Sequence, residues 1–126
     1  MKRVTLALVA VLTLAACAGS SGYGDHRFES AAELQQVLAG TGYSCSKADD
    51  KAKTEISLNK YGFDQVLCSD GHAEIWRSDV VRLEIQAKSF NALKPGTVRI
   101  EGLNWTVTVP TDRVDQVNKV LKGAVK

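Results

Sequence analysis

Residues 66–76, VLCSDGHAEIW, carry the strongest fold signal in the chain. Asp70-Gly71 is a dipeptide typical of two-residue hairpin turns, and the runs on either side have the composition of short strands. With a turn of two residues, Ser69 faces His72 across the hairpin. One face is then apolar and is expected to turn inward; it carries Val66, Cys68, Ala73 and Ile75. The stretch therefore predicts an antiparallel hairpin with one buried face.

Residues 98–109 predict a second hairpin, because both of its arms alternate between apolar and polar side chains. A tip at residues 102–105 brings four aliphatic side chains onto one face. The expected pairs are Ile100 with Val107 and Val98 with Val109. Pro110 lacks an amide N–H and ends the second arm.

Three segments have the pattern of helices. Ser30 and Glu33 form a capping box ahead of a helix over 31–39. An apolar stripe predicts a last helix over 114–121. Residues 78–92 fit either a strand or a helix, and their length favours the helix. Its apolar stripe is then Val80, Leu83, Ala87 and Phe90.

The segment between the first helix and the first hairpin gives weaker signals. Residues 43–46 alternate like a short strand, and the charged residues 47–54 predict a surface loop. Residues 56–63 carry apolar bulk without a period that assigns them. Taken together, the elements predict a single α+β domain: a small antiparallel sheet with about three helices packed on one face.

The N-terminus has the pattern of a lipoprotein signal. Lys2-Arg3 precedes an apolar run over 4–14, which is too short for a membrane span of about 20 residues. Leu14-Ala15-Ala16-Cys17 then reads as a lipobox, in which Cys17 receives the lipid. The alternative is an ordinary secretory signal with a cysteine near the cleavage site.

The lipobox divides the chain into three parts. Residues 1–16 are the predicted signal peptide, 17–27 the lipidated cysteine with a flexible Gly- and Ser-rich tether, and 28–126 the folded domain. Removal of Lys2 and Arg3 leaves 14 basic and 14 acidic side chains, so no net positive charge remains. This balance argues against binding of nucleic acid, whose affinity comes largely from neutralised phosphates.

The chain has three cysteines, and the predicted lipidation accounts for Cys17. Outside the cytoplasm the other two are expected to form a disulfide, Cys45–Cys68, which closes a loop of about two dozen residues and stabilises the fold by roughly 3–4 kcal/mol. The alternatives are two free thiols or a metal pair. A zinc site is disfavoured because Cys68 and His72 point to opposite faces of the predicted hairpin and His26 is the only other histidine.

Candidate catalytic residues are few. His72, its predicted cross-strand partner Ser69 and Glu74 lie near one another on the polar face of the first hairpin. A polar strand face commonly contains these residue types, and no strained Gly-x-Ser-x-Gly turn is present. We therefore expect no catalytic site, no metal site and no cofactor. His26 is interpreted as a solvated loop residue.

The chain as a whole resembles a group of small lipoproteins from actinobacteria. The resemblance rests on the capped helix from Ser30, Gly42-Tyr43-Ser44-Cys45, the second cysteine Cys68, the late strand Gly102-Leu103-Asn104-Trp105-Thr106-Val107 and the closing helix. It covers nearly all of the mature part, and its motifs are structural. The resemblance implies a cell-membrane lipoprotein of unknown function.

The expected function is that of a non-enzymatic module on the outward, extracytoplasmic face of the cell membrane. The module is anchored through lipid on Cys17 and binds a protein, a peptide or an envelope component. Two alternatives remain: a small envelope hydrolase that uses Ser69, His72 and Glu74, or an inhibitor or immunity-type protein that acts on an enzyme in the same compartment.

Overall fold

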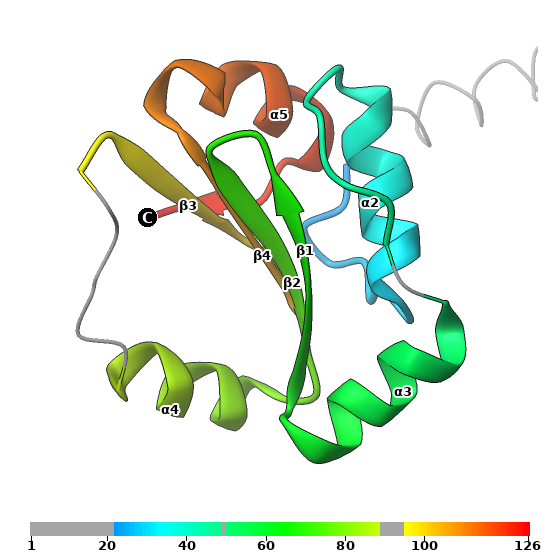
Figure 1. Cartoon of the computed structure of the whole chain (residues 1–126). Coiled ribbons are helices and arrows are strands. Elements are labelled where there is room, and N and C mark those ends of the chain that lie inside the picture. Colours follow the sequence, from blue (N-terminus) through cyan, green and yellow to red (C-terminus); the bar gives the residue numbers. More distant parts are fainter. Residues whose placement is uncertain (1–21, 49, 89–94) are drawn as a thin grey trace, which may run out of the picture.

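The computed structural model describes residues 22–48, 50–88 and 95–126. In these ranges the chain forms a five-stranded antiparallel sheet in the order β1-β2-β4-β3-β5, with helices around it (Figure 1). The strands are β1 (Phe63–Cys68), β2 (Gly71–Trp76), β3 (Thr97–Glu101), β4 (Trp105–Pro110) and β5 (Ala124–Val125). The helices are α2 (Ala31–Gly40), α3 (Lys51–Lys60), α4 (Asp79–Lys88) and α5 (Val114–Leu121), and a 3₁₀ turn at Thr111–Arg113 leads into α5. The predicted α+β class is confirmed.

The core lies between one face of the sheet and helices α2 and α5. Every second residue of strands β1 to β4 faces this side of the sheet, because side chains alternate between the faces of a strand. The strands contribute Val66, Ala73, Ile75, Ile100, Trp105, Val107 and Val109, and the helices contribute Leu34, Leu38, Val117 and Leu121. The predicted helices at 31–39 and 114–121 are thereby confirmed; most of their apolar side chains face the core, whereas Val37 and Val120 line an open groove.

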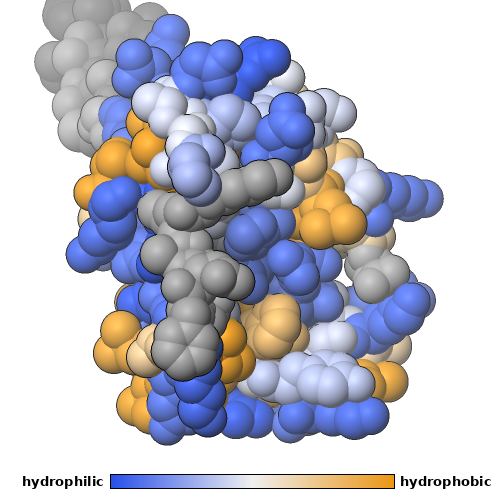
Figure 2. All heavy atoms as spheres, turned by 60° about the vertical axis from the view of Figure 1, so that its left-hand side comes forward, coloured by the Kyte–Doolittle hydropathy of each residue, from blue (hydrophilic) through white to orange (hydrophobic). Residues whose placement is uncertain are grey.

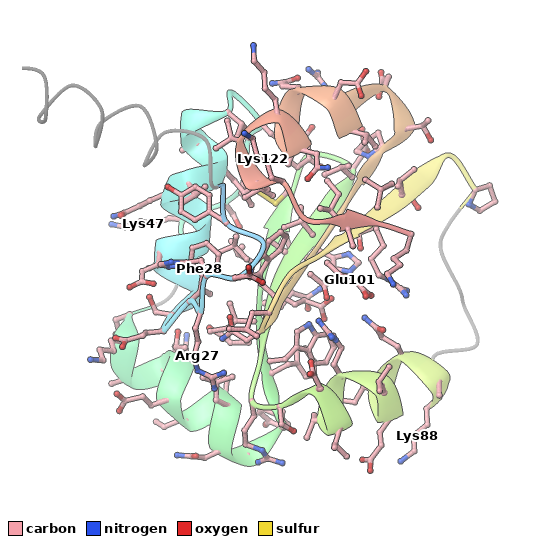
Figure 3. All side chains as sticks on the ribbon, turned by 180° about the vertical axis from the view of Figure 1, so that it is seen from behind. Arg27, Phe28, Lys47, Lys88, Glu101 and Lys122 are labelled. Carbon is pink, nitrogen blue, oxygen red and sulfur yellow. A yellow bond between two sulfur atoms is a disulfide. The ribbon has the colours of Figure 1, made fainter. Side chains whose placement is uncertain are left out.

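Helix α4 occupies a different place from the one predicted. Residues 79–88 are helical, as their length suggested, but α4 lies across the sheet from α2 (Figures 1 and 3). Two residues of its predicted core stripe, Val80 and Leu83, are 64% and 63% exposed. Phe90 of that stripe lies outside the described residues. The prediction of three helices on one face is therefore wrong for α4.

Helix α3 includes residues 51–54 of the loop predicted at 47–54, whereas residues 47, 48 and 50 lie outside regular structure. The Asp50 side chain caps it by accepting a hydrogen bond from the Lys53 amide at 2.9 Å. Only Thr54 is buried, and its hydroxyl donates to the Asp64 carboxylate on β1 at 2.7 Å. The sequence of α3 has no apolar stripe, so its pattern does not predict a helix. The predicted strand at 43–46 is reduced to a single bridge between Cys45 and Cys68.

The two hairpins differ in how well their register was predicted. In the second hairpin, Ile100 pairs with Val107 and Val98 with Val109, as expected. In the first, Cys68 pairs with Gly71 and Leu67 with His72, so the register is shifted by two residues from the prediction. Because side chains alternate with a period of two, this shift leaves the predicted apolar face intact.

Candidate functional site

The face of the sheet opposite the core is polar, and its residues lie in two parallel rows across four strands. We define the polar face by these eight side chains. The first row, in the order β1, β2, β4, β3, is Leu67, His72, Thr108 and Arg99. The second row is Gln65, Glu74, Thr106 and Glu101.

Basic and acidic side chains of the polar face are neighbours along the strands. His72 Nε2 lies 3.2 Å from Glu74 Oε1 on β2, and Arg99 Nη1 lies 3.9 Å from Glu101 Oε2 on β3. The two glutamate side chains are only 13% and 15% exposed, whereas that of His72 is 37% exposed. Each carboxylate thus has a basic neighbour. Thr106 and Thr108 in the middle of the face are 1% and 6% exposed, so the accessible donors and acceptors lie on either side of them.

Helix α4 and an aromatic pair border the polar face at one end. Trp76 on β2 stacks obliquely on Phe63, and its indole N–H donates to the Thr106 hydroxyl at 3.1 Å. Arg82 of α4 donates to the carbonyl of Gly102 at 2.9 Å. Figure 2 looks onto the α4 side, where hydrophilic residues predominate and apolar ones form separate patches.

The predicted Ser69, His72 and Glu74 group is only partly assembled. His72 and Glu74 are in contact, but Leu67 rather than Ser69 lies opposite His72. Ser69 belongs to the turn, where its carbonyl accepts a hydrogen bond from the Tyr43 hydroxyl. The shift of two residues therefore removes the geometric basis of the predicted serine and histidine pair.

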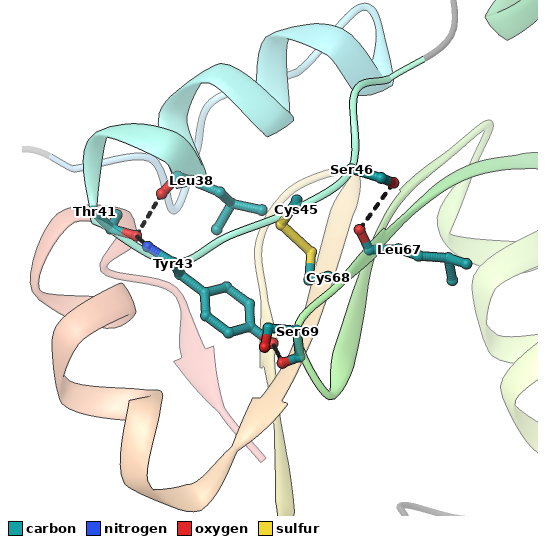
Figure 4. Close-up of a disulfide and its surroundings, with 8 residues drawn as sticks. All are labelled: Leu38, Thr41, Tyr43, Cys45, Ser46, Leu67, Cys68 and Ser69. Carbon is teal, nitrogen blue, oxygen red and sulfur yellow. Dashed lines mark hydrogen bonds between the residues drawn. A yellow bond between two sulfur atoms is a disulfide. The ribbon is translucent and has the colours of Figure 1, made fainter.

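The disulfide joins Cys45 to Cys68, the predicted partners (Figure 4). Around it, the Ser46 amide donates to the Leu67 carbonyl at 2.7 Å and the Ser69 amide to the Ser44 carbonyl at 2.9 Å. Tyr43 is buried beside this bridge. Burial raises the pKa of the Tyr43 hydroxyl above its ordinary value of 10.0; nearby Asp70 raises it further and Arg113 opposes the change.

Residues 22–28 pack against the domain, so the predicted tether is wrong for 22–27, whereas Phe28 was predicted to belong to the domain. The Tyr23 amide donates to the Leu121 carbonyl at 2.7 Å, and the Trp105 indole N–H donates to the Tyr23 carbonyl at 3.0 Å. Phe28 is 2% exposed, and both its backbone groups bond to the side-chain amide of Asn104 at 2.9 and 2.8 Å. Two aromatic residues in a Gly-rich stretch were the signal that could have revealed this packing.

An open groove lies beside this segment, between it, α2 and α5. Its volume is about 520 Å³, and its lining includes Tyr23, His26, Phe28, Gln36, Val37 and Val120. The Tyr23 ring stacks on Phe28 with centroids 5.8 Å apart, and His26 meets both rings edge-on. His26 is exposed, as predicted, but it belongs to this aromatic group. The groove was not foreseen from the sequence.

Within the described ranges, no group of three His, Cys, Asp or Glu side chains is placed to hold a metal ion. In the same part of the chain, no helix has the length and apolar character needed to cross a bilayer. Cys17, the predicted lipidation site, lies outside the described residues.

Comparison with known proteins adds information about the N-terminus. Residues 1–18 match the family model of the prokaryotic membrane lipoprotein lipid attachment site. The match supports a prokaryotic lipoprotein that lipid anchors to a membrane. No curated protein and no solved structure matches the chain. The resemblance to small actinobacterial lipoproteins stays a prediction.

Proposed function

We propose that this lipoprotein is a non-enzymatic binding module on the outward side of the membrane, and that its polar face binds a protein, a peptide or an envelope component. The proposal rests on one observation: the register of four strands places eight side chains in two ordered rows on the side of the sheet away from the core. Six of them are at least partly exposed, and they include the Arg99–Glu101 ion pair and the contact between His72 and Glu74.

Two properties of the polar face suit it to binding. First, the contacts with His72 and Arg99 orient Glu74 and Glu101 before a ligand arrives, so less side-chain freedom is lost on binding. Second, Leu67 at the edge of the face is 63% exposed and supplies an apolar contact next to the polar rows. A ligand with mixed polar and apolar groups fits this combination.

The test places a photo-crosslinking side chain on the polar face of the full anchored protein in cells. Gln65 lies in the second row and is exposed; Asp115, also exposed, lies on α5 outside the groove and serves as the control. We expect a discrete adduct from position 65 that position 115 does not give. The same adducts from both positions, or none from position 65, would contradict the proposal.

Hydrolysis is the competing function, and the register is what favours binding over it, since Ser69 does not lie opposite His72. The His72→Ala variant separates the two functions. If the purified protein has a hydrolytic activity on envelope material that this variant loses while its circular dichroism is unchanged, the binding proposal is wrong. If the adduct partner is an enzyme bound one to one, the protein is of the inhibitor or immunity type.

A further inference from the structure

The point at which the anchor joins the domain is fixed. Three hydrogen bonds hold the first described residues: Tyr23 N–H to Leu121, Trp105 Nε1–H to Tyr23, and Leu103 N–H to the Gly24 carbonyl at 2.9 Å. Gly22 lies directly against the Lys122 side chain, and a Cβ at Gly22 would come within 2.6 Å of the Lys122 Cβ. The chain therefore leaves the domain at one defined place, at the C-terminal end of α5.

The distance from this place to the lipid is short. Gly22 follows Cys17 by five positions, and five residues span at most about 18 Å when fully extended. A domain of this size has a diameter of roughly 35 Å, judged from its expected radius of gyration of about 13 Å. The side that bears α4 lies across the sheet from α2 (Figure 3). So short a connection cannot bring that side into contact with the bilayer.

The surface next to the anchor is the groove between the N-terminal segment, α2 and α5. Its lining combines aliphatic and aromatic side chains with the polar Gln36 and with Glu33, whose carboxylate accepts a hydrogen bond from the Glu29 amide. Val120 on its wall is 36% exposed. Tyr23 has an apolar ring with a hydroxyl at its edge, and the neighbouring His26 ring carries two polar nitrogens. Side chains of this type favour the boundary between lipid headgroups and acyl chains, where one end is apolar and the other is hydrated.

We propose that this groove faces the bilayer in which Cys17 is anchored and is occupied by the interfacial part of its lipids, that is, the ester region and the first methylenes of the acyl chains. The domain then has one orientation on the membrane. The polar face points away from the bilayer, toward the space outside. The proposal rests on the lipid anchor and stands independently of the ligand proposed for the polar face.

The test uses the full lipidated protein in phosphatidylcholine vesicles that contain lipids with a spin label near the headgroup. A fluorophore is attached through Val120→Cys in the groove or, as the matched aliphatic control, through Leu83→Cys on α4, which is 63% exposed. We expect several-fold stronger quenching and a blue-shifted emission at position 120. Equal quenching at both positions, or none at position 120, would overturn the proposal.

A second measurement guards against an effect of the label itself. The fluorophore is moved to Gln36→Cys, which also lies on the groove, so that Val120 is free to be mutated. Docking is then compared between Val120→Glu and the control Leu83→Glu. We expect Val120→Glu to remove the quenching and Leu83→Glu to leave it, with the vesicles still carrying the protein in flotation. Quenching that survives Val120→Glu, or that high salt abolishes, would show that the apolar groove is not the contact.

Discussion

At Gly71, strand β2 passes so close to its neighbours that no side chain fits. A Cβ there would collide with the Thr108 carbonyl and lie 2.7 Å from the Tyr43 hydroxyl. The left-handed residue of the turn is instead Asp70, with φ of 58°. Gly71 is thus required by tertiary contacts with β4 and Tyr43, and this close approach fixes the register of the first hairpin.

We predict that Gly71→Ala destabilises the protein by about 1–3 kcal/mol, because the added methyl group must push a backbone carbonyl aside. Gly40, at the end of α2, is the control, since nothing lies within 4 Å of a Cβ at that position. Gly40→Ala should leave the stability unchanged or raise it by up to about 1 kcal/mol. Urea unfolding of both variants checks this, and equal midpoints would contradict it.

Tyr43 makes the stability depend on pH in the alkaline range. Its pKa in the folded protein is raised above 10.0, chiefly by burial, so the folded state holds the proton more tightly than the unfolded state. The stabilisation is complete below pH 10.0 and is lost as the pH rises through the folded pKa. The free energy of unfolding should fall with pH above 10.0, and less steeply in Tyr43→Phe; equal slopes would count against this assignment.

At the scale of elements, α3 depends on contacts with strand β1 and on the disulfide that closes the segment around it. The segment from Cys45 to Cys68 is closed by the disulfide and contains α3, whose buried anchor is the pair Thr54 and Asp64. The helix has little apolar surface of its own, and most helices gain their stability from packing. The disulfide and the paired strand β1 therefore hold α3 in place.

Removing the disulfide, by reduction or by the double variant Cys45→Ala and Cys68→Ala, should cost about 3 kcal/mol, because the unfolded chain regains the freedom of the open loop. Thermal unfolding with and without reductant measures the loss. The double variant is also the control, since reductant should not change its stability. A reduced protein as stable as the oxidised one would refute the prediction.

At the scale of the whole molecule, the N-terminal segment completes the domain. Phe28 is buried against the core, with its ring centroid 6.2 Å from that of Trp105. The Tyr23 carbonyl of this segment also accepts the hydrogen bond from the Trp105 indole N–H. It thus both closes the core and determines where the lipid anchor leaves the domain.

A chain that begins at Gly22 should fold with the stability of the mature protein, whereas a chain that begins at Glu29 should lose at least about 3 kcal/mol. The reason is that deletion of residues 22–28 removes the buried Phe28 ring and leaves a cavity against Trp105. Denaturant unfolding of the two chains compares them. Indistinguishable stabilities would show that the segment only rests on the surface.

The sequence by itself determined the lipid attachment site, the α+β class, the disulfide partners and the register of the second hairpin. These features depend on local patterns: an apolar run before a cysteine, alternation with a period of two, and a helical stripe.

The tertiary structure alone decided the register at Gly71, the place of α4, the existence of α3 and the packing of residues 22–28. Each of these follows from a contact between residues far apart in the chain, such as Gly71 with Thr108 or Phe28 with Asn104. No local pattern encodes such contacts, because their free energy comes from the close approach of separate elements.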